Sequence, residues 1–229
     1  EKVGFVGAQF LKIEAGAKGF GMGNAIDPVV NDASAVFSNP AGLTQSPKRS
    51  LFSSNGNYLF DSQQSAMSIS THLPFRGVLA LSYHGVNSGE MNETTYIQQN
   101  GTGNKFSTGS FALGLGYAIS LTDKFSFGIH WKYINEDLLK GLDQYADDYG
   151  NGSTWGIDVG TLYLTGYKSL KIGMSIRNFG PDLKLGGNYT DYNNGEEIVD
   201  EVTGEVIKHN FKPYGLPLTF RFGISADPI

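Results

Sequence analysis

The chain is poor in the residue types that stabilise or coat an ordinary soluble domain. Only 17% of its 229 residues are charged, and it has no cysteine, which excludes a disulfide framework and a thiolate metal site. It also lacks a run of about 18 apolar residues, the length that a membrane-spanning helix needs. The formal net charge is −5 and there is no block of basic residues, so we expect no nucleic-acid partner.

Glycine and aromatic residues are abundant instead, and they follow a period of two. The chain has 31 Gly, 15 Phe and 12 Tyr. In residues 111–120 the large apolar side chains occupy odd positions and Gly, Ala or Ser occupies most even ones. The same alternation returns at 125–133, 170–177 and 218–225, where charged residues lie opposite the bulky ones. A period of two predicts β-strands rather than helices.

The composition of the two strand faces predicts a membrane location. A soluble β-sandwich buries its apolar face and covers the other with Lys, Glu and Thr, whereas the second face here is mostly Gly, Ser and Ala. Aromatic residues lie near the expected strand ends, at Tyr58, Tyr83, Tyr117, Trp131, Tyr133 and Trp155. Lipid against one face and a polar lumen against the other explain both features, so we predict an all-β fold, an antiparallel transmembrane β-barrel. A soluble sandwich or barrel with these aromatics in its core is the alternative.

Loop lengths support the barrel prediction. We expect strands at 51–60, 64–73, 77–87, 106–120, 124–135, 154–165, 169–178 and 217–226. From the second strand onward the connections alternate between three residues and much longer polar segments, which is typical of outer-membrane barrels with short periplasmic turns. In one long loop, Asp143, Asp147, Asp148 and Asn151 could ligate Ca²⁺, but their spacing lacks the order of a dedicated site, and a solvated loop is the alternative.

No motif of an enzyme is present. The sequence has no nucleophile elbow, phosphate-binding loop, dinucleotide fingerprint or zinc-protease motif. The four histidines are dispersed without helical spacing, at His72, His84, His130 and His209. We therefore predict a protein without catalytic residues, metal site or cofactor.

Residues 1–50 precede the first strand and contain the most specific sequence signals. They combine "AQFLKIEAGAKGFGMGNA" at 8–25 with "NDASAVFSNPAGL" at 31–43. The combination resembles the start of PorV/PorQ-type outer-membrane proteins, and the second stretch resembles the Asn-Pro-Ala region of the wider FadL-type transporter superfamily. Later segments, "GIDVG" at 156–160, "IRNFGP" at 176–181 and "LPLTFRFGISADP" at 216–228, are similar to strands of the same family.

The resemblance implies two parts, a hatch over residues 1–50 that folds into the lumen and barrel strands over 51–229. Small residues of the hatch, Gly19, Gly21 and Gly23, would let its backbone pack closely against the wall. The hatch turn would comprise Asp32, Asn39, Pro40, Ala41 and Gly42. Polar side chains expected to face the lumen are His130, Lys132, Asp158, Lys171, Arg177 and Arg221. We expect the turn to be a conformational lock, with a direct ligand site as the alternative.

The expected strand number falls short of the family's barrel. The resemblance implies 14 strands, whereas the sequence offers about eight and ends at Ile229 rather than at an aromatic residue. We therefore expect that C-terminal strands are missing from this sequence; a closed eight-stranded barrel, with little lumen for the hatch, is the alternative. The expected location is the outer membrane of a Gram-negative bacterium, as a mature chain without its signal peptide.

Two functions follow from the resemblance. The first is an accessory or shuttle component for export and surface attachment of proteins by type IX secretion, with secretion-machinery proteins and exported cargo as partners. The second is FadL-like passive transport of a hydrophobic small molecule. Membrane lipid would contact the protein in both cases. The stretch 8–25 favours the first, whereas the Asn-Pro-Ala turn is common to both. A soluble β-domain that serves as a binding module is a third possibility.

Overall fold

The structure is a computed structural model that describes most of the chain. The described residues are 6–58, 61–74, 76–95, 97–140, 149–190, 192–193, 196–197, 199–200 and 203–227.

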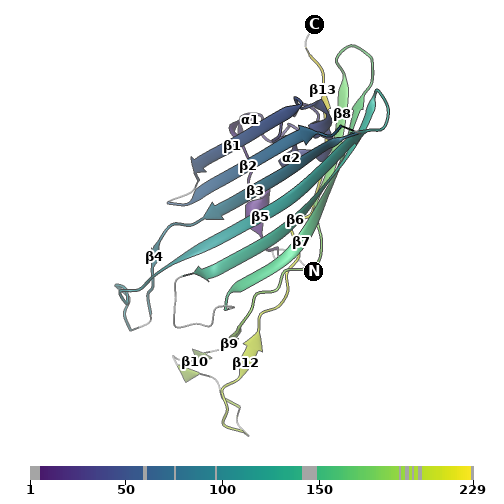
Figure 1. The fold of residues 1–229 in the computed structure, drawn as a ribbon. Coiled ribbons are helices and arrows are strands. Elements are labelled where there is room, and N and C mark those ends of the chain that lie inside the picture. The colour runs from purple at the N-terminus through teal and green to yellow at the C-terminus, as the bar shows by residue number, and fades with distance from the viewer. Residues whose placement is uncertain are drawn as a thin grey trace.

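One antiparallel sheet dominates the fold (Figure 1). Its order is β1 (Arg49–Asn57), β2 (Gln63–His72), β3 (Val78–Asn87), β5 (Lys105–Ser120), β6 (Phe125–Lys140), β7 (Asn151–Leu164), β8 (Lys171–Phe179) and β13 (Thr219–Ser225), with β4 (Met91–Asn92) added to β5. Strands that are neighbours in this order also follow one another along the chain, except that β4 lies between β3 and β5 and a long excursion separates β8 from β13. The all-β class predicted from the alternation is confirmed.

The predicted strands agree with the observed ones to within a few residues, except around one long loop. There β6 continues to Lys140 and β7 begins at Asn151, although the apolar alternation has stopped by Asn135. The ladder extends because β6 keeps pairing with β5 and β7 through polar residues such as Glu136 and Asp137. Short strands also occupy the last long loop, in two separate ribbons: β9 (Asn188–Thr190) with β12 (Lys208–Asn210), and β10 (Tyr192–Asn193) with β11 (Glu196–Glu197).

The sheet is open. β1 and β13 are at its two ends and each pairs with a single neighbour. The alternative of a closed eight-stranded barrel is therefore wrong for this chain. No helix within the described residues combines the length and hydropathy needed to cross a membrane.

The outer face of the sheet, the face with the bulky side chains, forms a continuous apolar band. Register pairs join Leu51 to Ile69, Leu81, Leu115, Trp131 and Ile157 across six strands. Ile176 and Phe220 continue the band on β8 and β13. These side chains are not in a protein core: Phe220 is 64% exposed and Trp131 is 48% exposed. Single exposed hydrophobics are normal, but a contiguous face of this extent marks a surface that meets lipid or another protein.

The inner face is covered by an N-terminal segment, residues 6–48. It contains η1 (Gln9–Lys12), α1 (Ala17–Gly21), α2 (Ala35–Ser38) and η2 (Pro40–Gln45). Figure 1 shows this segment within the curve of the sheet, and η2 packs against β5, β6 and β7. Two apolar clusters form the interface, one around Val36 and Leu43 and the other around Phe10 and Ile134. The core of the molecule therefore lies between the segment and the sheet.

Candidate functional site

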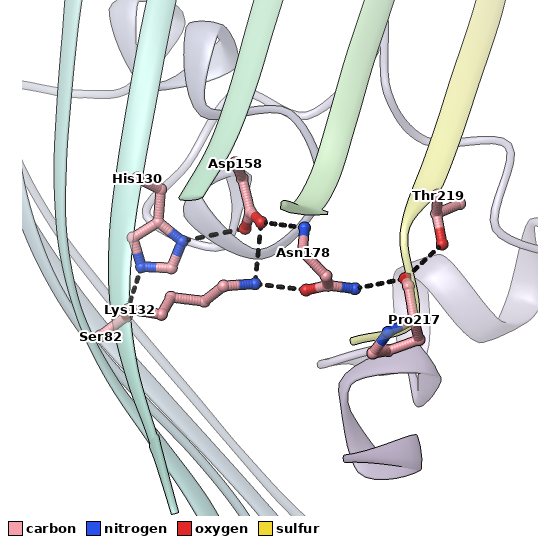
Figure 2. A network of polar contacts seen from close by, with 7 residues as sticks. All are labelled: Ser82, His130, Lys132, Asp158, Asn178, Pro217 and Thr219. Atoms are coloured by element: carbon pink, nitrogen blue, oxygen red, sulfur yellow. Dashed lines mark hydrogen bonds and ion pairs between the residues drawn. The ribbon is translucent and has the colours of Figure 1, made fainter. Parts of the chain in front are cut away.

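A buried polar network lies on the inner face at the centre of the sheet (Figure 2). His130 Nδ1 contacts Asp158 Oδ2 at 3.2 Å, and Lys132 Nζ contacts Asp158 Oδ1 at 2.8 Å. His130, Lys132 and Asp158 are each at most 5% exposed. They share a face because residues two apart on one strand point the same way and His130 is the register partner of Asp158. The carboxylate thus binds one imidazole and one ammonium group.

A bulge in β8 completes the network. The β7–β8 register shifts between Ile157 and Val159, and Asn178 adopts a left-handed conformation with φ 61°. As a result both Arg177 and Asn178 are buried, whereas strict alternation would turn one of them outward. The Asn178 backbone N–H donates to Asp158 Oδ1 at 2.7 Å, its side chain accepts from Lys132 Nζ, and its Nδ2 donates to the Pro217 carbonyl at 3.0 Å.

Ser82, His130 and Asp158 have the hydrogen-bond order of a Ser-His-Asp triad. Ser82 Oγ lies 2.8 Å from His130 Nε2, on the side of the ring away from Asp158. The same groups line a cavity of only about 10 Å³ between the N-terminal segment and the sheet. A site for an organic substrate usually has several hundred Å³. In this arrangement the serine has no room for an acyl substrate, so we interpret the network as structural.

Arg221 joins the N-terminal segment to the last strand. Its Nη1 lies 3.4 Å from Glu14 Oε2 and 3.7 Å from Asp27 Oδ1. Both carboxylates are nearly inaccessible to solvent. Asp27 Oδ2 also accepts a hydrogen bond from Ser175 Oγ on β8. Because the partners are far apart in sequence, these contacts hold residues 14–27 against β8 and β13.

Asn39 is fully buried and uses both ends of its amide. Its Nδ2 donates to the carbonyls of Asp27 at 3.1 Å and of Thr161 on β7 at 3.0 Å, and its Oδ1 accepts from the Ala41 N–H at 3.1 Å. Pro40 follows as the first residue of η2, where its missing N–H is no loss. All three of these partners of Asn39 are backbone groups.

The N-terminal segment approaches the sheet closely because of glycines in the sheet, not because of glycines in the segment. A Cβ on Gly128 or Gly160 would lie within 3 Å of Pro40 or Asn39 atoms. In contrast, Gly21 and Gly23 are exposed and have no atom within 4 Å of a Cβ position. The three atoms nearest to a Cβ on Gly19 all belong to the side chain of Glu14, which lies in the segment itself. The predicted wall-packing role of these three glycines is therefore wrong. Gly42 does require its small size, because a Cβ would lie 2.8 Å from the Val30 carbonyl oxygen.

The first described residues are fastened to the long-loop end of the sheet. Gly7 N–H donates to the Gly215 carbonyl at 3.0 Å, and Ala8 N–H donates to Glu136 Oε2 at 3.3 Å. Tyr214 donates its hydroxyl to the same carboxylate oxygen at 3.1 Å. Burial, with the nearby charge of Glu136, raises the pKa of Tyr214 above its ordinary value, so this phenol remains a donor at neutral pH.

The remaining predicted residues have simpler surroundings. Asp32 Oδ1 accepts from the Ser34 N–H at 2.8 Å and so shapes the turn before α2. Lys171 is half-buried on the inner face at the start of β8. Among the described residues no group of three or more His, Cys, Asp or Glu could hold a metal ion. Asp143, Asp147 and Asp148, considered for Ca²⁺, lie outside the described residues.

Several residues of the site were not singled out from the sequence. They are Glu14, Asp27, Ser82, Asn178 and, as a neighbour of His130 in the same cavity, His84. Alternation could have placed Ser82 and His84 on the inner face, but nothing in the sequence locates the bulge that turns Asn178 inward.

Comparison of the chain with protein-family models, with curated proteins and with solved structures found no match.

Proposed function

We propose that this chain forms part of an outer-membrane β-barrel wall and acts as an accessory or shuttle component for protein export and surface attachment by type IX secretion. The observation that carries the membrane part is the apolar band. On β6 it extends from Phe125 to Tyr133, which is nine residues, and a tilted transmembrane strand needs about 9 to 11. Polar residues begin immediately after it, at Asn135.

Aromatic side chains at the two ends of the band support the same proposal. Tyr133 is the register partner of Trp155 toward the long loops, and Phe125 is the partner of Tyr163 toward the short turns. Aromatic girdles at both interfaces are typical of outer-membrane barrels. A barrel would also protect the two edge strands of the sheet, β1 and β13. In a closed barrel every strand pairs on both sides, so that no strand edge is left free.

The firm attachment of the N-terminal segment to the inner face favours the accessory role over passage of solutes. Asn39 and Arg221 fasten the segment to the inner face by buried contacts, and the central cavity is about 10 Å³. At the long-loop end an aromatic cluster is partly open to solvent, with ring centroids 5.5 to 5.8 Å apart; it consists of Tyr149, Tyr189, His209 and Phe211. Tyr, with its apolar ring and polar tip, is common at protein interfaces.

A second function, passive transport of a hydrophobic small molecule, is favoured by one observation. A hollow of about 530 Å³ lies beside the N-terminal segment and is lined in part by Phe10, Ile13, Phe20 and Val86. This volume is within the range of small-molecule sites.

Affinity purification in mild detergent distinguishes the two functions. The accessory role predicts that secretion-machinery or exported proteins co-purify with the chain, and that the aromatic-cluster variant Tyr189→Ala reduces their yield. A matched variant on the outer face, Tyr163→Ala, should leave the yield unchanged. A barrel that is recovered without other proteins but with bound lipid or another hydrophobic small molecule would contradict the accessory role and support transport.

A further inference from the structure

Arg177 is a buried cation with no hydrogen-bond or ion-pair partner among the residues that the structure describes. It is only 7% exposed, and its Nε atom is buried with no hydrogen-bond acceptor. Within the described part of the chain, no carboxylate lies within ion-pair distance of its guanidinium group. Buried charges in proteins are generally paired and hydrogen-bonded, because leaving them unpaired is costly. The burial of this arginine therefore indicates a hydrogen-bond acceptor that the described side chains do not supply.

The surroundings of Arg177 are positively charged. Arg177 and Lys132 line the same small cavity as Asp158, His84 and His130. The two cations and one carboxylate give a formal charge of +1 before either histidine is counted. Asp158 is already engaged, because His130, Lys132 and the Asn178 N–H all bind its oxygens.

The other carboxylates described near this cavity do not act as a counter-ion for Arg177. Glu14 and Asp27 lie next to Arg221, on the neighbouring strand. Lys132 donates to Asp158 and to Asn178, which leaves one of the three ammonium protons for a further acceptor. The cavity thus offers hydrogen-bond donors from two cations and holds only one carboxylate to balance them.

We propose that this cavity binds a single small monovalent anion of the chloride type between Arg177 and Lys132. The volume of about 10 Å³ is close to the space that one water molecule needs, so an organic acid would not fit without movement of the N-terminal segment. A water molecule could accept hydrogen bonds there, but it would leave the excess charge uncompensated. The anion would hold β6 and β8 together beneath the segment, whatever the protein's role in the membrane.

Bromide is the probe, because it replaces chloride and scatters anomalously. Crystals of the detergent-purified protein grown in bromide should give a bromine peak in contact with the Arg177 guanidinium. In thermal unfolding at constant ionic strength, replacing gluconate by bromide should raise the midpoint by roughly 3 to 5 °C per tenfold increase above the dissociation constant.

Two matched variants assign the effect to this cavity. Arg177→Gln should abolish the difference between bromide and gluconate, whereas Arg221→Gln, which removes a cation from the adjacent strand, should retain it. Wild-type crystals with no bromine peak at Arg177, or an Arg177→Gln protein that keeps the full bromide effect, would overturn the proposal. If Arg177→Gln does not fold, the wild-type bromine map decides alone. None of these outcomes depends on which cargo or ligand the protein serves.

Discussion

Replacement of Asn39 by Ala should loosen the N-terminal segment while the sheet stays intact. The substitution leaves the buried Ala41 N–H without its acceptor, which costs about 1 to 3 kcal/mol, and removes two bonds to the carbonyls of Asp27 and Thr161, each worth about 0.5 to 1.5 kcal/mol. The sum is about 2 to 6 kcal/mol. At about 1.4 kcal/mol per factor of ten, local opening becomes roughly 30-fold to 20,000-fold more frequent.

Hydrogen exchange measured by mass spectrometry on the detergent-purified protein tests this prediction. Amides in residues 31–46 should exchange faster by that factor, because they exchange through local opening, while peptides of β6 and β7 should be unchanged. Gln45→Ala is the matched control, since Gln45 is exposed in the same η2 and should have no effect. The reasoning is refuted if Asn39→Ala exchanges like wild type over residues 31–46, or if the whole sheet loses protection with it.

Three further experiments test other parts of the structure. Gly160→Val should displace η2, because its Cβ would overlap Asn39; N-terminal exchange as slow as in wild type would contradict the close approach. Asp158→Asn should destabilise the protein by about 3 to 5 kcal/mol in urea unfolding, because it leaves Lys132 without its carboxylate. Adding Lys132→Met should restore part of this loss. If the effects of the two substitutions simply add, the two side chains are not coupled. Leu115→Lys should cost about 2 to 4 kcal/mol in lipid vesicles, against about 0 to 1 for Leu121→Lys in a short turn; equal costs would argue against a lipid-facing band.

Most of the sheet is predictable from the sequence because alternation is a local signal. The paired segments at Leu113 and Tyr133, for example, alternate bulky apolar residues with small or polar ones, and short turns such as 121–124 fix which strands are neighbours. The extension of β6 to Lys140 is not predictable in this way. There the pairing depends on the partner strands, and the polar side chains leave no apolar pattern.

The site is predictable only in part. Alternation places His130, Lys132 and Asp158 on one face, and their mutual contacts follow from register. The bulge at Asn178 depends on tertiary context, although "RNFG" contains an Asn that tolerates the left-handed conformation. The prediction for Gly19, Gly21 and Gly23 failed because a glycine-rich sequence shows only that its backbone could pack closely. It does not show whether another part of the chain lies against it, and here the close contacts are at Gly128 and Gly160.

The most direct test of the membrane-wall proposal uses the two tryptophans of the chain. Trp131 and Trp155 both lie on the outer face, 48% and 43% exposed. Trp131 is two residues further into the band than Tyr133, the register partner of Trp155. The protein should be reconstituted into vesicles whose lipids carry brominated acyl chains, with the single-tryptophan variants Trp131→Phe and Trp155→Phe measured separately. We predict strong quenching of both fluorophores, with Trp131 quenched more by bromines deep in the chain. Emission that aqueous iodide quenches and brominated acyl chains do not would contradict a lipid-facing outer surface.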